Sequence, residues 1–175
     1  MSGSTLAPNS AALQVWQPCN GLASQGTWLL EASAGTGKTW QLSSLVARLV
    51  IEQELAIERI LIITFTNNAT AELRHRVRER LAEVRDTLTE LILDPNALPA
   101  LAAPVAAHDE RDLVLRHLCY GAAASPPHDT ETRKKRRNLA KIALSCFDLA
   151  PISTIHGFCQ RMLDTLAFES GQDAG

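Results

Sequence analysis

The sequence predicts an α/β fold, in which a parallel sheet that carries a phosphate-binding loop is followed by a mostly helical segment. Three observations predict it. A glycine-containing loop at residues 31–39 (EASAGTGKT) lies between an apolar run and a helical pattern. A continuous aliphatic run follows at residues 60–63, and a long helical pattern comes directly after it. Strand, loop, helix, strand and helix in this order form a βαβ unit with its successor helix.

The first element in this order is the loop, which has the composition of a phosphate-binding site. Gly35 and Gly37 let the backbone N–H groups turn toward a polyphosphate, Lys38 is placed to reach the β- and γ-phosphates, and Thr39 is placed to bind Mg²⁺. A surface loop with a stray lysine is the plainer alternative. We expect Lys38 and Thr39 to carry the catalytic contacts, with Thr39 as the metal ligand through the nucleotide. The predicted cofactor-binding residues of the loop are Ala32, Ser33, Ala34, Gly35, Thr36, Gly37, Lys38 and Thr39.

Apolar spacing predicts the elements after the loop. A helix of about four turns is expected from the apolar residues between positions 42 and 50. The run at 60–63 is apolar on both faces, as expected of a strand buried in a parallel sheet. A helix is predicted over residues 68–93, and its arginines between positions 74 and 80 alternate with glutamates, which is typical of ion pairs on a helix surface.

The second half of the chain is predicted to be mostly helical. Residues 94–127 are rich in alanine and proline, with a short helix expected at 112–118. A basic helix is predicted over 132–147, and residues 152–156 lead into a last amphipathic helix. The expected boundaries are an extension at 1–26, the N-terminal part of the nucleotide-binding domain at 27–93, a helical insertion at 94–150, and a final segment at 151–175.

Composition limits the class of protein. The chain has 175 residues, 46% hydrophobic and 21% charged, with a formal net charge of −2, so any affinity for nucleic acid must come from local patches. The four cysteines are widely spaced and are expected to be reduced thiols. No apolar stretch approaches the length of a membrane span, and the N-terminus lacks a signal-peptide pattern, so we expect a cytoplasmic protein without membrane contact.

Three segments, in this order, resemble the front end of superfamily-1 DNA helicases of the UvrD/Rep type. They are the phosphate loop, residues 64–77 (TFTNNATAELRHRV), which are similar to motif Ia, and residues 153–159 (STIHGFC), which are similar to the Thr-x-His motif. Within this superfamily, the loop together with residues 154–163 (TIHGFCQRML) and 167–171 (AFESG) resembles the beta subunits of exodeoxyribonuclease V, the RecB type.

This resemblance implies a RecA-like motor domain that uses ATP and Mg²⁺. It implies an ATP-dependent helicase and exonuclease subunit that acts on DNA ends in recombinational double-strand-break repair, with gamma and alpha subunits as partners. The implied ligands are single-stranded and duplex-end DNA. By position in the motifs, the expected DNA-binding residues are Phe65, Thr66, Asn67, Thr154 and His156. For Phe65 the alternative is a core residue that closes the sheet.

Other features of the resemblance are incomplete. The family's acidic pair that completes Mg²⁺ binding should follow a third apolar strand, but the only Asp-Glu pair, Asp109–Glu110, has no strand before it and is interpreted as a helix start. We therefore expect the 175-residue chain alone to be inactive. Gln25 is the candidate for base recognition, with Gln17 as an alternative.

Two other functions stay open. A small-molecule P-loop kinase would need an arginine-rich lid and does not account for residues 65–77. A non-catalytic nucleotide-binding module is compatible with the missing acidic pair. The basic run at residues 133–137 (RKKRR) is interpreted mostly as a solvated helix face rather than a specific site.

Overall fold

The computed structural model describes residues 37–94, 110–121 and 127–169. In chain order, the elements are α1 (Lys38–Ile51), the 3₁₀ turn η1 (Ile57–Arg59), β1 (Ile62–Thr64), α2 (Asn67–Leu93), α4 (Glu110–Cys119), α5 (Thr130–Ser145), the 3₁₀ turn η2 (Phe147–Leu149), β2 (Ile152–Thr154) and α6 (Ile155–Glu169). The helices confirm the predicted ones within two or three residues. Helix α4 begins at Glu110, as the interpretation of the Asp-Glu pair as a helix start requires.

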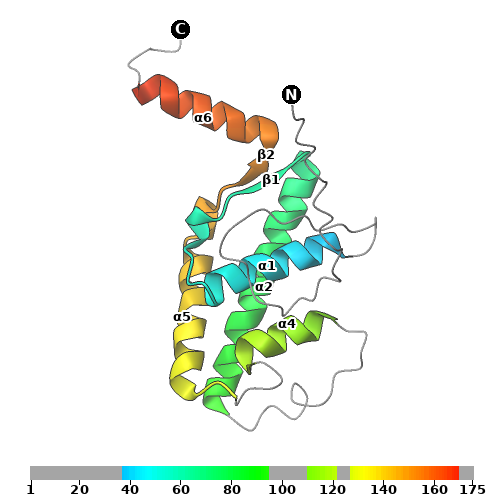
Figure 1. Ribbon diagram of the computed structural model, residues 1–175, viewed down its shortest axis with the longest axis vertical. Coiled ribbons are helices and arrows are strands. Elements are labelled where there is room, and N and C mark those ends of the chain that lie inside the picture. Colours follow the sequence, from blue (N-terminus) through cyan, green and yellow to red (C-terminus); the bar gives the residue numbers. More distant parts are fainter. Residues whose placement is uncertain (1–36, 95–109, 122–126, 170–175) are drawn as a thin grey trace, which may run out of the picture.

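Helix α2 is the central element of the described residues. Its buried side chains recur every three or four residues, so they form one stripe along 27 residues. Helix α5 packs along this stripe, α1 crosses α2, and α4 packs near its C-terminal end (Figure 1). Ala140 and Ala143 of α5 are buried, and their small side chains allow α5 to approach α2 closely. The buried α2 residues are Leu73, Val77, Arg80, Leu81, Val84, Leu88 and Leu91.

Strands β1 and β2 form a parallel pair at the end of this helical body where α2 begins (Figure 1). The register pairs Ile62 with Ile152 and Thr64 with Thr154. Helix α2 follows β1 and α6 follows β2, so both helices begin at the same edge of the pair. Helices and a parallel strand pair agree with the predicted α/β class.

The prediction that the run at residues 60–63 is buried on both faces is wrong for the described residues. Leu61 and Ile63 are 47% and 42% exposed, whereas Ile60 is buried. Successive side chains of a strand point to opposite faces, and α2 packs on only one of them. Within the described part of the chain, no element buries the other face.

The basic run on α5 is not mainly a solvated face. Arg133 is buried, and its guanidinium carbon lies 5.9 Å from the centre of the Tyr120 ring. The Nη1 of Arg136 donates to the carbonyl oxygen of Leu118 at 2.7 Å, near the C-terminal end of α4. Cations are favoured at that end because the last carbonyl groups of a helix lack partners within it. Only Lys134 and Lys135 of this run are exposed, so the arginines mainly attach α5 to α4.

A buried ionic cluster attaches α4 to α1. Glu52, at the C-terminal end of α1, accepts hydrogen bonds from Nε and Nη2 of Arg48 at 2.7 and 2.8 Å, and Nε2 of His117 lies 3.2 Å from the same carboxylate. Burial raises the pKa of Glu52, but the hydrogen bonds from His117 and Arg48 outweigh it and lower the pKa to about 2. The charged carboxylate is therefore stabilised by folding.

We expect Glu52→Gln to lower the free energy of unfolding by roughly 2–3 kcal/mol at neutral pH. Because the folded-state pKa is depressed, this contribution is present above the ordinary pKa of about 4.5 and is lost as the pH falls toward 2. Urea unfolding at several pH values from 7 downward measures it, with the exposed Glu58→Gln as the control. The free energies of unfolding of the two variants should become equal in acid. A difference between them that does not depend on pH would contradict the depressed pKa of Glu52.

Candidate functional site

The predicted phosphate loop enters the described part of the chain at Gly37. Its φ of 83° and ψ of 24° place Gly37 in the left-handed region, where glycine is favoured, and Gly37 is the N-cap of α1. The backbone N–H of Gln41 donates to the carbonyl oxygen of Gly37 at 2.9 Å, which begins the helix. Lys38 is exposed and Thr39 is half-buried in the first turn. The other predicted cofactor-binding residues, Gln25 and residues 32–36, lie outside the described residues.

The first turn of α1 can accept an anion. The first N–H groups of a helix have no acceptor within the helix, and the helix dipole places partial positive charge there. The N-cap is a glycine, so it has no side chain that could accept from these groups. An exposed ammonium at Lys38 and a hydroxyl at Thr39 lie in the same turn, so the residues present fit a nucleotide phosphate with its Mg²⁺.

Trp40 joins this turn to the central helix. The guanidinium carbon of Arg80, on α2, lies 5.4 Å from the centre of the Trp40 ring. The Arg80 side chain is only 5% exposed and forms an ion pair with Glu83. A cation–π contact with the buried Arg80 therefore helps to hold the first turn of α1 against α2.

A second group of predicted residues lies where β1 ends. Phe65 follows the strand and is 89% exposed, so the alternative of a core phenylalanine is wrong for the described residues. Thr66 is the N-cap of α2, and its Oγ1 accepts from the backbone N–H of Ala69 at 3.1 Å. Its hydroxyl proton remains a donor. Asn67 is exposed in the first turn of α2.

The junction after β2 repeats this arrangement. The Oγ1 of Thr154 accepts from the backbone N–H of Gly157 at 3.1 Å, and His156 is exposed in the first turn of α6. A Cβ on Gly157 would lie 3.3 Å from Oγ1 of Thr154, so a larger residue would crowd the capping hydroxyl. Both threonines that were predicted to bind DNA are thus also helix caps, which the motif comparison did not indicate.

The parallel register brings the two junctions together. Thr64 pairs with Thr154, so Phe65, Thr66 and Asn67 emerge at the same edge as His156 (Figure 1). We call the surface formed by Phe65, Thr66, Asn67, Thr154 and His156 the strand-end rim. Two helices begin at this rim, and each adds the positive end of its dipole. This edge can bind a phosphate chain, and Phe65 can stack on a planar base.

The arginines of α2 were interpreted mostly as surface pairs, but Arg74 and Arg80 also have contacts inside the fold. Arg76 does form an ion pair with Glu79 on the surface, and Nε2 of His75 lies 3.1 Å from the same carboxylate. Arg80 is buried against Trp40, and Nη2 of Arg74 donates to the carbonyl oxygens of Ile152 at 3.0 Å and Ala150 at 3.4 Å. The carbonyl groups that Arg74 contacts lie 76 and 78 positions later in the sequence, so the local spacing of residues cannot indicate these contacts.

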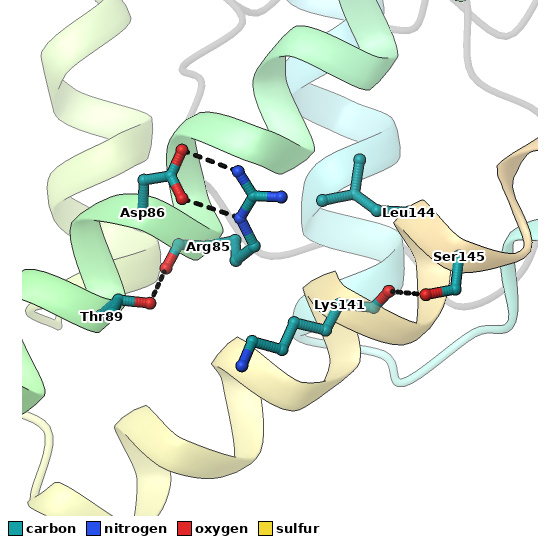
Figure 2. Close-up of a pocket in the computed structure, with 6 residues that line it drawn as sticks. All are labelled: Arg85, Asp86, Thr89, Lys141, Leu144 and Ser145. Carbon is teal, nitrogen blue, oxygen red and sulfur yellow. Dashed lines mark hydrogen bonds and ion pairs between the residues drawn. The ribbon is translucent and has the colours of Figure 1, made fainter.

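A groove of about 530 Å³ lies between α2 and α5 and is lined by no residue of the strand-end rim (Figure 2). Some of its polar groups have local partners. Arg85 donates twice to Asp86, which lowers the pKa of that carboxyl group, and Thr89 donates to the carbonyl oxygen of Arg85. The remaining lining residues are Lys141, Leu144 and Ser145. The described residues also contain no cluster of three or more His, Cys, Asp or Glu residues that could hold a metal ion.

Comparison with known families identifies a helicase domain in this chain. The profile of the UvrD/REP helicase N-terminal domain matches residues 14–174. The chain belongs to this family of helicase domains. The family assignment favours a helicase over the small-molecule kinase. No helix within residues 37–94, 110–121 and 127–169 is long and apolar enough to cross a membrane.

Among curated proteins, the chain is similar to the RecB subunit of the RecBCD enzyme. It is 37% identical to the Haemophilus influenzae subunit over 152 residues and 34% identical to the Escherichia coli subunit over 155 residues. The Mycolicibacterium smegmatis subunit is 37% identical over 150 residues. These matches cover 82%, 84% and 85% of this chain but only 11% of each relative, so the chain spans about a ninth of their length.

Proposed function

We propose that the chain is the ATP-binding N-terminal part of a DNA helicase and exonuclease subunit of the exodeoxyribonuclease V type. It adopts a RecA-like P-loop fold. Its segments are an extension at 1–26, the N-terminal part of the nucleotide-binding domain at 27–93, a helical insertion at 94–150 and a final segment at 151–175. The whole protein acts on single-stranded and duplex-end DNA in recombinational double-strand-break repair, together with gamma and alpha subunits. The similarity to RecB subunits supports this proposal.

The observation that carries the DNA part of the proposal is the strand-end rim. An exposed phenylalanine and two helix N-termini lie at the carboxyl edge of a parallel strand pair, where open α/β sheets bind their ligands. Phe65 stacks on a base, and Thr66, Asn67, Thr154 and His156 bind the phosphate backbone. Stacking and phosphate contacts do not read sequence, as a motor that moves along DNA requires.

The nucleotide part of the proposal rests on the start of α1. Lys38 neutralises charge on the β- and γ-phosphates, the Thr39 hydroxyl holds Mg²⁺, and residues 32–37 surround the phosphates with backbone N–H groups. Gln25 recognises the base. Bound Mg²⁺ would neutralise charge that develops on the phosphates during hydrolysis.

Phe65→Ala tests the DNA part. We expect single-stranded DNA to bind roughly 5- to 100-fold more weakly, because stacking on one base contributes about 1–3 kcal/mol. No charge is lost, so the dependence of affinity on salt should stay the same. Fluorescence anisotropy of a labelled oligonucleotide over a series of salt concentrations measures both quantities.

Leu93→Ala is the matched control for this experiment. Leu93 is 80% exposed at the opposite end of α2, so its loss removes a similar amount of exposed apolar surface away from the rim. It should bind the oligonucleotide like the wild type. If Phe65→Ala also binds like the wild type, the rim is not the DNA site.

A further inference from the structure

The two halves of the strand-end rim are connected by an arginine that lies farther along α2. Arg74 lies eight residues after Thr66 on α2, about 12 Å along the helix axis. Its Nη2 donates to the carbonyl oxygen of Ile152, two residues before Thr154. The Arg74 side chain therefore connects the helix that begins at one junction to the strand that leads to the other.

A second contact lies one turn farther along the same face of α2. The guanidinium carbon of Arg78 lies 5.6 Å from the centre of the Phe147 ring, and Phe147 is 1% exposed. An Arg78–Asp148 pair at 4.0 Å is mostly exposed and contributes little. Arg74 and Arg78 thus both contact the segment from Phe147 to Ile152, which leads into β2.

Arg74 makes the more specific of these contacts. Ile152 is buried, so its carbonyl group is shielded from water and depends on protein donors. A charged donor strengthens such a hydrogen bond. Arg74 is also partly buried.

Resting on the proposed function, we infer that Arg74 is a positioning residue for DNA binding, which fixes the distance between the Phe65–Thr66 and Thr154–His156 junctions. It carries no phosphate contact of its own.

Arg74→Gln tests this inference in the 175-residue chain. We expect single-stranded DNA affinity to fall on the order of tenfold, because both halves of the rim must contact one strand in a fixed geometry. The slope of affinity against salt should not change. Arg74→Lys keeps the charge and a donor, and is expected to lose only about threefold. Circular dichroism confirms that each variant is folded at the temperature of the measurement.

Two comparisons separate positioning from other roles. Arg85→Gln removes the same charge from the same helix about 16 Å farther along, and should bind DNA like the wild type. The double variant Phe65→Ala/Arg74→Gln should lose less affinity than the product of the two single losses, since misplacing an absent ring has no cost. A purely structural role would leave the two losses independent.

The other outcomes overturn the inference in distinguishable ways. If Arg74→Gln lowers the salt slope by about 0.7, the value for one phosphate contact with a single strand, Arg74 contacts DNA directly. Wild-type affinity in both Arg74 variants, with a clear loss in Phe65→Ala, refutes the positioning role and leaves the proposed DNA site intact. Wild-type affinity in all three variants refutes the DNA site itself, and the positioning role with it.

Discussion

Replacing Lys38 with alanine is expected to weaken Mg²⁺–ATP binding by roughly 30-fold or more. Removing one member of a charged, hydrogen-bonded pair costs about 2–5 kcal/mol in a binding site. Lys38 lies exposed in the first turn of α1, directly after the left-handed Gly37, so its ammonium group is free to meet a phosphate that approaches the helix N-terminus. Isothermal titration calorimetry with Mg²⁺–ATP measures the effect.

Lys134→Ala is the control for net charge. Lys134 is exposed on α5 and pairs with Glu131 in the first turn of that helix, so its loss changes the charge of the chain equally without touching α1. It should bind ATP like the wild type. Equal affinity in wild type and Lys38→Ala would show that the nucleotide binds elsewhere.

Phe147→Ala is expected to lower the free energy of unfolding by about 3–5 kcal/mol, the range for removing a fully buried aromatic side chain. Phe147 is 1% exposed and packs in the core beneath the Arg78 guanidinium group. Domains are stable by only about 5–15 kcal/mol in total, so this single change would remove a large fraction. Urea unfolding followed by circular dichroism measures it.

Leu149→Ala gives a close comparison. Leu149 lies in the same 3₁₀ turn as Phe147 but is 67% exposed, so its truncation should cost less than about 0.5 kcal/mol. Similar losses in the two variants would mean that Phe147 is not a core residue.

Helices α1, α2, α4 and α5 could be predicted from the sequence because each buries one face, whereas α6 leaves Met162, Leu163 and Leu166 44–61% exposed. Leucine and valine recur every three or four residues along α2, and this period alone gives its extent within one residue. The aliphatic run at 60–63 predicted the strand β1, but the sequence did not indicate that β1 pairs with residues 152–154. The motif resemblance predicted the residues of the strand-end rim, and the register of β1 and β2 brings them to one edge.

Contacts between distant residues could not be predicted. Five adjacent cations on α5 look alike in the sequence, but Arg133 lies on Tyr120 and Arg136 at the end of α4, whereas Lys134 and Lys135 face solvent. Which cation is buried depends on what packs against each face of the helix. The same holds for Arg74 and Arg80. The capping role of Thr66 and Thr154 could have been predicted from the sequence, since threonine directly before a helix is a favoured N-cap.

The pairing of Ile62 with Ile152, ninety positions later, also bears on how this protein folds. Closing so long a loop costs chain entropy before the strand pair contributes any contact, whereas the helices can form from local interactions. We therefore expect the helices to form first and β2 to join β1 late. During synthesis, the edge that carries Phe65 stays incomplete until residues 152–154 have left the ribosome. Until then, the exposed side chains of β1 are the part of the nascent chain most open to wrong pairing.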